Sequence, residues 1–203
     1  MTGRSTFLSL ASLAGIVLVS ALLVAGTWQL TRERIAENDA RGLMEELAAV
    51  LPAGLYNNAP RKDRVLLDTG SGMALPVYRA RQNGTPVAAA LTVVATDGYT
   101  GPITLLVGVA ANGRVTGVQI VAQTETAGIG SRVQDNRWLD RFAGHSLLDP
   151  LPDRWTPRAD GGDFDAVAGA TVSSRAVIGG VRRAVQYFAS HRDAIFAPVT
   201  DDD

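Results

Sequence analysis

A threonine stands at the start of the last predicted helix, within the sequence DFDAVAGATVSSRAVIGGV. Thr171 directly follows two small residues, Gly169 and Ala170. A hydroxyl at this position is typical of a helix N-cap, where the side-chain oxygen accepts an N–H of the first turn. The capping box is incomplete, because neither Glu nor Gln stands three residues later.

The same position is suited to a phosphate group. The first turn of a helix offers free backbone N–H groups and the positive end of the helix dipole. Gly169 and Ala170 leave the backbone open to a bulky group, and Ser173 and Ser174 add hydroxyl donors. From these residues alone, Thr171 is either a capping residue or the attachment point of a phosphate-bearing group.

The composition excludes several kinds of function. A net charge of −1 and an isoelectric point near 6.1 give no support to nucleic-acid binding, which requires clustered Lys and Arg. The chain has no cysteine, so disulfides, zinc–thiolate sites and cysteine-bound iron–sulfur clusters are excluded. The two histidines, His145 and His191, are too few for an all-histidine metal site. We therefore predict no metal site.

The N-terminal segment predicts a membrane anchor. The run Phe7–Leu30 contains no charged residue and is long enough to cross the roughly 30 Å hydrocarbon core as a helix. Trp28 stands at its far end, where an interfacial ring is expected. A cleaved signal peptide is the alternative, but the apolar run exceeds the roughly 7–15 residues of a typical signal-peptide core. Arg4 on one side and Arg32 and Arg34 on the other leave the orientation undecided.

The rest of the chain predicts one α+β domain outside the membrane. We expect an anchor over residues 1–31, a connecting helix and loop over 32–60, and the domain over 61–203. Alternating apolar residues and Gly-bearing turns predict three strands, and helical periodicity predicts three helices. The strands are expected at Pro86–Thr96, Pro102–Ala110 and Arg114–Gln123, and the helices at Glu33–Val50, Arg137–Ala143 and Val172–Ser190.

The last predicted helix has one apolar face. This face is formed by Val177, Val181, Ala184, Val185 and Phe188. We expect it to be buried against the sheet, which would fix the position of Thr171 at the start of the helix.

Three segments in order resemble one family. The sequence DAVAGAT, which ends at Thr171, resembles the acceptor motif D-x-x-[ST]-G-A-T of flavoproteins whose threonine is joined to FMN by a phosphoester. TETAGIGSRVQDNRWLDRF, at 124–142, resembles the E-T-P-G-L-G segment of that family with its following W-x-x-x-F. GYTGPITLLVGVAANGRVTGVQIV, at 98–121, resembles the paired strands that lead into it. Together with the N-terminal anchor, this set resembles the G subunit of the Rnf (Rsx) electron-transport complex, in the FMN-binding domain family.

The chain departs from the family pattern at three positions. Ala168 stands where the family has Ser or Thr, so one hydroxyl near the acceptor is missing. Ala127 replaces the family's proline and reduces the rigidity of the loop. Ile129 replaces a leucine and keeps apolar bulk for a flavin ring.

The resemblance implies roles for individual residues. Thr171 is the covalent attachment point of FMN rather than a catalytic residue, and Asp165 positions or activates it during attachment. Ser173 and the N–H groups near Val172 hold the phosphate. The residues expected to line or approach the flavin are Glu125, Thr126, Ile129, Gly130, Gly169 and Ala170. Without the resemblance, Asp165 is an acidic residue before a helix and 125–130 is a glycine-rich loop. Trp138 and Phe142 are predicted to be core residues.

The resemblance also implies a function. The chain is expected to be an electron-transfer subunit, anchored in the bacterial inner membrane with its domain in the periplasm. Its complex would couple ferredoxin and NAD(H) redox chemistry to sodium or proton translocation. The expected partners are the other subunits of the complex and a flavin transferase that uses FAD. The alternatives are the C subunit of the sodium-pumping NADH:quinone reductase, which carries the same motif, and a membrane-anchored scaffold with a vestigial motif.

Overall fold

The computed structural model of the protein describes residues 2–69, 72–128 and 130–197. Ile129, one of the predicted site residues, lies outside them. The chain forms two compact units, Met1–Leu43 and Met44–Asp203. The second unit contains the predicted FMN-binding domain.

The first unit is helical. Helix α1 spans Thr2–Val50, so the predicted anchor and the predicted connecting helix form one continuous element. The large apolar side chains from Leu13 to Leu30 are exposed. A helix that is apolar on all sides suits a lipid environment. Among the described residues, α1 is the one helix long and apolar enough to cross a membrane.

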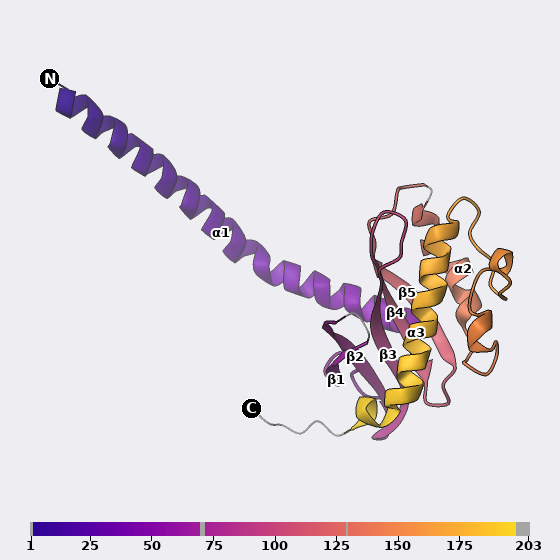
Figure 1. The fold of residues 1–203 in the computed structure, drawn as a ribbon. Helices are drawn as coiled ribbons and strands as arrows, with labels where there is room; N and C mark the ends of the chain where they lie inside the picture. The colour runs from indigo at the N-terminus through magenta and orange to yellow at the C-terminus, as the bar shows by residue number, and fades with distance from the viewer. Residues whose placement is uncertain (1, 70–71, 129, 198–203) are drawn as a thin grey trace. The chain divides into compact units, whose positions relative to one another are not determined.

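The second unit contains a five-stranded antiparallel sheet in the order β1-β2-β3-β4-β5 (Figure 1). The three predicted strands are present within a few residues of their expected ends, as β3 (Thr85–Ala95), β4 (Ile103–Ala110) and β5 (Val115–Ala122). Two strands that were not predicted precede them, β1 (Arg64–Asp68) and β2 (Ala74–Gln82). The predicted α+β class is confirmed.

Helix α3 covers one face of this sheet (Figure 1). It spans Thr171–Phe196 and is longer than predicted, with non-helical backbone angles at His191. The predicted apolar face is buried in the core, as Val177, Val181, Ala184, Val185 and Phe188. Its packing against β3 and β4 sets where the helix begins.

The end of α1 packs against the other side of β4 and β5. Gly108 of β4 pairs with Gly117 of β5. A Cβ atom on either glycine would collide with the backbone of Ala49 or Val50. Thr116 Oγ1 also donates to the carbonyl oxygen of Val50 at 2.5 Å. The two glycines therefore allow the helix backbone to approach the sheet closely.

Short helical turns fill the segment between β5 and α3. The predicted helix at Arg137–Ala143 is present as α2 (Asn136–Leu139) and the 3₁₀ helix η2 (Asp140–Phe142). The other 3₁₀ helices are η1 (Gly130–Gln134), η3 (Pro152–Arg154) and η4 (Arg158–Asp160). Trp138 and Phe142 are buried in the core, as predicted.

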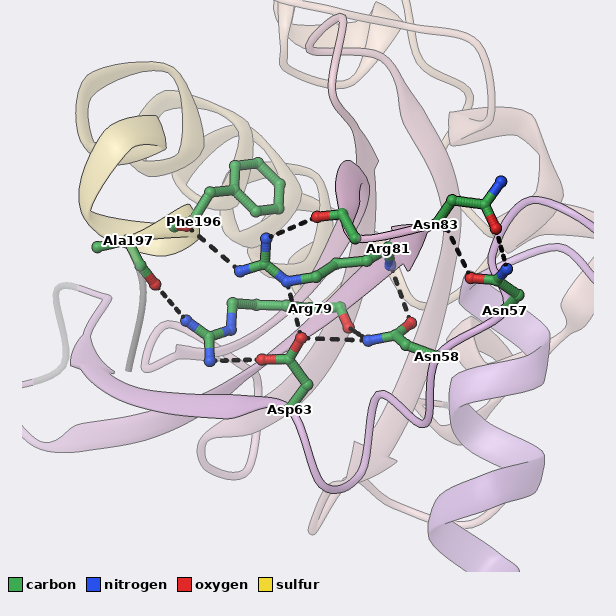
Figure 2. Close-up of polar contacts among 9 residues, drawn as sticks. Asn57, Asn58, Asp63, Arg79, Arg81, Asn83, Phe196 and Ala197 are labelled. Carbon is green, nitrogen blue, oxygen red and sulfur yellow. Dashed lines mark hydrogen bonds and ion pairs between the residues drawn. The ribbon is translucent and has the colours of Figure 1, made fainter. Parts of the chain in front are cut away.

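A polar cluster fixes the C-terminal end of α3 to β2 (Figure 2). Arg79 is buried, forms an ion pair with Asp63 and donates to the carbonyl oxygen of Ala197 at 2.7 Å. Arg81 contacts the second oxygen of Asp63 at 2.9 Å and the carbonyl oxygen of Phe196 at 3.3 Å. One carboxylate thus orients two arginines toward the C-terminal end of α3. We call these residues the Arg79–Asp63 cluster.

Candidate functional site

A hollow of about 350 Å³ lies at the N-terminal end of α3. Its walls come from the β3–β4 loop, the segment after β5 and the first turn of α3. The lining residues are Tyr99, Thr126, Gly130, Gly169, Ala170, Thr171, Val172 and Ser173. The volume falls within the roughly 300–1,000 Å³ of small-molecule sites. The hollow brings together seven of the ten residues that the sequence assigned to flavin binding.

Thr171 is the first residue of α3 and not its N-cap. The N-cap is Ala170, which makes no side-chain cap hydrogen bond. The capping prediction is wrong by one position, because Ala170 already accepts the first helical hydrogen bond, from Ser174 N at 2.8 Å. Thr171 is exposed. No hydrogen bond of its side chain is present among the described residues, so its hydroxyl is available for chemistry.

The first turn of α3 offers unpaired donors. The N–H groups of Thr171, Val172 and Ser173 take part in none of the backbone hydrogen bonds described outside the regular elements, and a helix supplies no internal partner for them. These groups carry the positive end of the helix dipole. All three residues line the hollow, so a phosphate on Thr171 would find donors nearby.

Hydrogen bonds among its own residues and with Ser174 hold the turn before α3 in place. Ser174 is buried, and its Oγ accepts the N–H of Val167 at 3.0 Å. Ala170 donates its N–H to the carbonyl oxygen of Val167 at 2.9 Å. Gly169 has a φ of 80°, which favours glycine at this position. The turn therefore presents Thr171 on a fixed backbone.

Glu125 lies beneath the hollow rather than on its surface. It is only 7% exposed. Oε1 accepts the N–H of Tyr99 at 2.7 Å and that of Thr100 at 3.4 Å. Oε2 accepts the hydroxyl of Ser173 at 2.9 Å. The Ser173 hydroxyl, which was expected to hold a phosphate, is thus directed away from the opening.

Tyr99 is a wall residue that the sequence reasoning did not identify. It is 70% exposed and lines the same hollow as the start of α3. The signal available in the sequence was an aromatic residue between two glycines, Gly98 and Gly101, in a loop between predicted strands. An exposed ring at the rim of a hollow suits contact with a flat ligand.

Asp165 lies in a different hollow from Thr171. This second hollow, of about 150 Å³, includes Trp138, Arg141, Phe142, His145, Arg158, Asp163, Phe164 and Asp165 in its lining. The Asp165 carboxylate contacts Arg141 at 2.5 Å and Arg158 at 3.3 Å. In the same hollow, a hydrogen bond from Arg154 holds the pKa of Asp163 below its ordinary value. Among the described residues, the side chain of Asp165 pairs with Arg141 and Arg158 and makes no hydrogen bond to Thr171.

The residues that line the hollow at Thr171 are of types that suit the phosphate and ring of a flavin mononucleotide. An exposed hydroxyl and three unpaired N–H groups suit a phosphoester, and the lining combines Tyr99 and Val172 with small residues. None of the described residues of the lining is a lysine or arginine, so charge on a phosphate would be met by backbone donors and the helix dipole.

Comparison with known proteins agrees with this geometry. Residues 98–186 match the family described as FMN-binding domain. The chain is 41% identical over 185 residues to the G subunit of the ion-translocating oxidoreductase complex of Cereibacter sphaeroides, covering 90% of this chain and 84% of that protein. The identity to the protein of the same name from Pseudomonas aeruginosa is 41% over 202 residues, covering 96% and 94%.

A solved structure shares the fold. The crystal structure of Shewanella oneidensis NqrC matches with a TM-score of 0.50 and 21% identity, covering 75% of this chain and 74% of that chain. This likeness supports the architecture of the domain. The family follows from the sequence relatives, which are similar over almost the whole chain. The chain belongs to the family formed by the G subunits of ion-translocating oxidoreductase complexes, and it contains an FMN-binding domain.

Proposed function

We propose that this protein is the membrane-anchored electron-transfer subunit of an ion-translocating oxidoreductase complex, with FMN joined to Thr171 through a phosphoester. The observation that carries the proposal is the exposed Thr171 at the start of α3, on the wall of a hollow of about 350 Å³. Bound FMN would supply reversible electron acceptance and donation, which no side chain here provides. The chain supplies the tether, the walls and the electrostatic environment.

Attachment uses the Thr171 hydroxyl as the nucleophile. Its oxygen forms a new bond to the FMN phosphorus of FAD, the bond from that phosphorus to the AMP portion breaks, and AMP leaves. The hydroxyl proton is lost to a base, and no electrons are transferred overall. A flavin transferase would catalyse this step. The unpaired N–H groups of Val172 and Ser173 would bind the phosphate afterwards.

The other lining residues shape the hollow. Thr126 and Gly130 form the wall from the loop after β5, and Gly169 and Ala170 form the turn that leads into α3. Ile129 would be an apolar contact of the flavin ring.

Asp165 would act during attachment rather than in the mature site. Its side chain is 45% exposed and can be reached by the transferase. Its present partners are Arg141 and Arg158.

The anchor and the partners complete the proposal. Helix α1 would cross the bacterial inner membrane once, with the domain in the periplasm, and the remaining subunits of the complex would bind the anchored chain. By the family resemblance, the complex couples ferredoxin and NAD(H) redox chemistry to sodium or proton translocation. N-terminal sequencing of the mature protein tests the anchor. A start at residues 26–31 would show that it is cleaved.

Intact mass and flavin fluorescence test the attachment site. The wild-type chain made with the transferase should exceed its sequence mass by one FMN less one water, with the excess on a peptide containing Thr171. Thr171→Val keeps the shape and should carry no flavin on a denaturing gel. Its free energy of unfolding should change by less than about 0.5 kcal/mol, because no cap hydrogen bond is lost. Thr85→Val, at an exposed threonine that begins β3, is the matched control and should retain the flavin.

The outcomes separate the alternatives. Flavin on Thr171→Val would place the attachment elsewhere, with Ser173 and Ser174 as the nearest hydroxyls. A wild-type chain without flavin, even with the transferase present, would support the scaffold. Subunits that co-purify decide between the two complexes, since a cluster-rich, ferredoxin-like subunit indicates the Rnf type and its absence favours the sodium-pumping quinone reductase.

A further inference from the structure

The carboxylate of Glu125 joins three segments that are distant in the sequence. Glu125 itself stands in the loop after β5. One oxygen binds the N–H groups of Tyr99 and Thr100 in the β3–β4 loop, and the other binds the hydroxyl of Ser173 in α3. Tyr99 and Ser173 both line the hollow. The position of two lining residues from different segments therefore depends on one buried side chain.

Two glycines keep the space that this side chain occupies. A Cβ atom on Gly130 would collide with the Glu125 side chain. A Cβ atom on Gly98 would lie 2.7 Å from Glu125 Oε1, and it would also collide with the carbonyl oxygen of Gly101. Thr100 adds a further tie, since its hydroxyl donates to the carbonyl oxygen of Thr124 at 2.6 Å. The loops are thus fitted around the carboxylate.

The charge of Glu125 has no cationic partner. None of the ion pairs described for residues 2–69, 72–128 and 130–197 includes this residue. All three contacts of its carboxylate oxygens come from donors, two N–H groups and one hydroxyl, which is the pattern that an ionised carboxylate requires. A negative charge therefore lies under the hollow, stabilised by dipoles and not cancelled by a cation.

We propose that Glu125 is a positioning residue of the flavin site: it fastens the Tyr99 loop to the first turn of α3 and keeps an uncompensated negative charge beside the hollow, which lowers the reduction potential of the cofactor. The proposal rests on the function proposed above. A buried charge acts over longer distances than an exposed one, because the surrounding protein screens it less than water does. Adding an electron next to this charge is disfavoured.

Glu125→Gln separates the charge from the shape. The amide oxygen can still accept the N–H of Tyr99, and the Ser173 hydroxyl can rotate to accept from the amide nitrogen. We expect normal flavin content and a more positive midpoint potential. The reduction equilibrium should shift by on the order of tenfold, which is about 59 mV for a one-electron couple. A redox titration of the flavin-loaded, full-length protein measures this shift.

Asp97→Asn is the matched control. It makes the same change in charge in the adjacent β3–β4 connection, but the Asp97 side chain is 54% exposed and lies 3.7 Å from Arg183. Solvent screens such a charge, so the potential should move much less than in Glu125→Gln. Equal shifts in the two variants, or an unchanged potential in a folded, flavin-loaded Glu125→Gln, would overturn the electrostatic part of the proposal.

Amide exchange tests the fastening without any cofactor. In the flavin-free Thr171→Val background, the N–H groups of Tyr99 and Thr100 should exchange faster when Glu125→Ala is added, while Glu125→Gln should restore most of the protection. Unchanged exchange in Glu125→Ala would overturn the positioning role. If Glu125→Ala does not fold, Ser173→Ala in the same background removes only the tie to α3. The N–H groups of Tyr99 and Thr100 should then exchange faster than in Thr171→Val alone, and unchanged or slower exchange would contradict the proposal.

The two proposals fail in different ways. A wild-type chain that never acquires flavin contradicts the proposed function, yet the exchange measurement still decides whether Glu125 fastens the loop. If the wild type carries flavin and Glu125→Gln has the same midpoint potential, only the further inference is contradicted.

Discussion

Ser173 donates its hydroxyl to Glu125 across 2.9 Å, although the two residues stand 48 positions apart in the sequence. Both side chains are buried. The hydroxyl is therefore committed to the floor of the hollow, while the N–H of the same residue stays free at the helix start. Ser173 thus offers a backbone N–H at the hollow, while its side chain stabilises the fold.

Ser173→Ala should therefore leave covalent flavin in place. The variant removes one hydrogen bond and leaves Oε2 of Glu125 without its partner. An unsatisfied buried acceptor costs about 1–3 kcal/mol, so urea unfolding should show a loss of this size, and gel fluorescence should match wild type. Loss of flavin with unchanged stability would show that the hydroxyl holds the phosphate after all.

Replacing either of two adjacent glycines of α3 by alanine should change the stability of the protein, but in opposite directions. Gly179 has room for a Cβ atom, whose nearest neighbour would be a side-chain nitrogen of Arg183 at 3.5 Å. A Cβ atom on Gly180 would meet the Leu105 side chain, which is fully buried. Gly179→Ala should stabilise the protein by about 0.5–1 kcal/mol through helix propensity, and Gly180→Ala should destabilise it by about 1–2 kcal/mol through overpacking. Thermal unfolding of both variants measures the difference, and a shared sign would contradict the packing of α3.

Asp163 should make stability depend on pH in the acidic range. A hydrogen bond from Arg154, together with the charges of Arg154, Arg158 and His145, holds the pKa of Asp163 below its ordinary value of 3.8. Because the folded-state pKa is the lower one, the stabilisation is present above pH 3.8 and is lost as the pH falls through the folded value.

The comparison of wild type with Asp163→Asn tests this dependence. Unfolding curves should differ at neutral pH and converge at the acidic end, and 1 M salt should narrow the difference at neutral pH because both partners are exposed. Asp140→Asn, at an exposed aspartate of η2, is the control. A difference that grows on acidification would refute the assignment.

Arg79→Met should be among the most destabilising changes in the Arg79–Asp63 cluster. The arginine is 2% exposed, and its removal leaves Asp63 partly unpaired and the carbonyl oxygen of Ala197 without its donor. Breaking a buried pair from one side costs about 3–5 kcal/mol, and the remaining contact from Arg81 favours the lower end. Arg81→Met should cost less, since its side chain is 19% exposed. Chemical denaturation that ranks Arg81 above Arg79 would show that burial does not decide the cost.

The sequence predicted the elements whose signals are local. The hairpin between β4 and β5 has Gly113 at a φ of 82°, in one of the Gly-bearing turns that the sequence predicted, and the apolar face of α3 is buried as predicted. Strand β2 was not predicted, because Pro76, Arg79 and Arg81 obscure its alternation. The partner of Arg79 at the C-terminal end of α3 lies 118 positions away, so no local window shows that this arginine is buried.

The site, too, was predictable where its residues stand close together in the sequence. Thr171, Gly169 and Ala170 form one motif, and the structure places them together in the hollow. Glu125 was expected to contact the flavin because it stands in the motif loop, but its partners come from two other segments and draw it beneath the surface. Asp165 was expected near Thr171, but the two arginines of the neighbouring hollow hold it there.

The Arg79–Asp63 cluster also constrains the length of α3. Both arginines bind main-chain carbonyl oxygens, at Phe196 and Ala197, so these polar contacts do not depend on which side chains stand there. What matters is how many residues separate these carbonyls from Thr171, which begins the same helix. Deleting one residue in between would turn everything beyond it by about 100° around the axis and shift it by about 1.5 Å. The helix thus acts as a ruler between the hollow at Thr171 and β2, intolerant of insertion or deletion along its length.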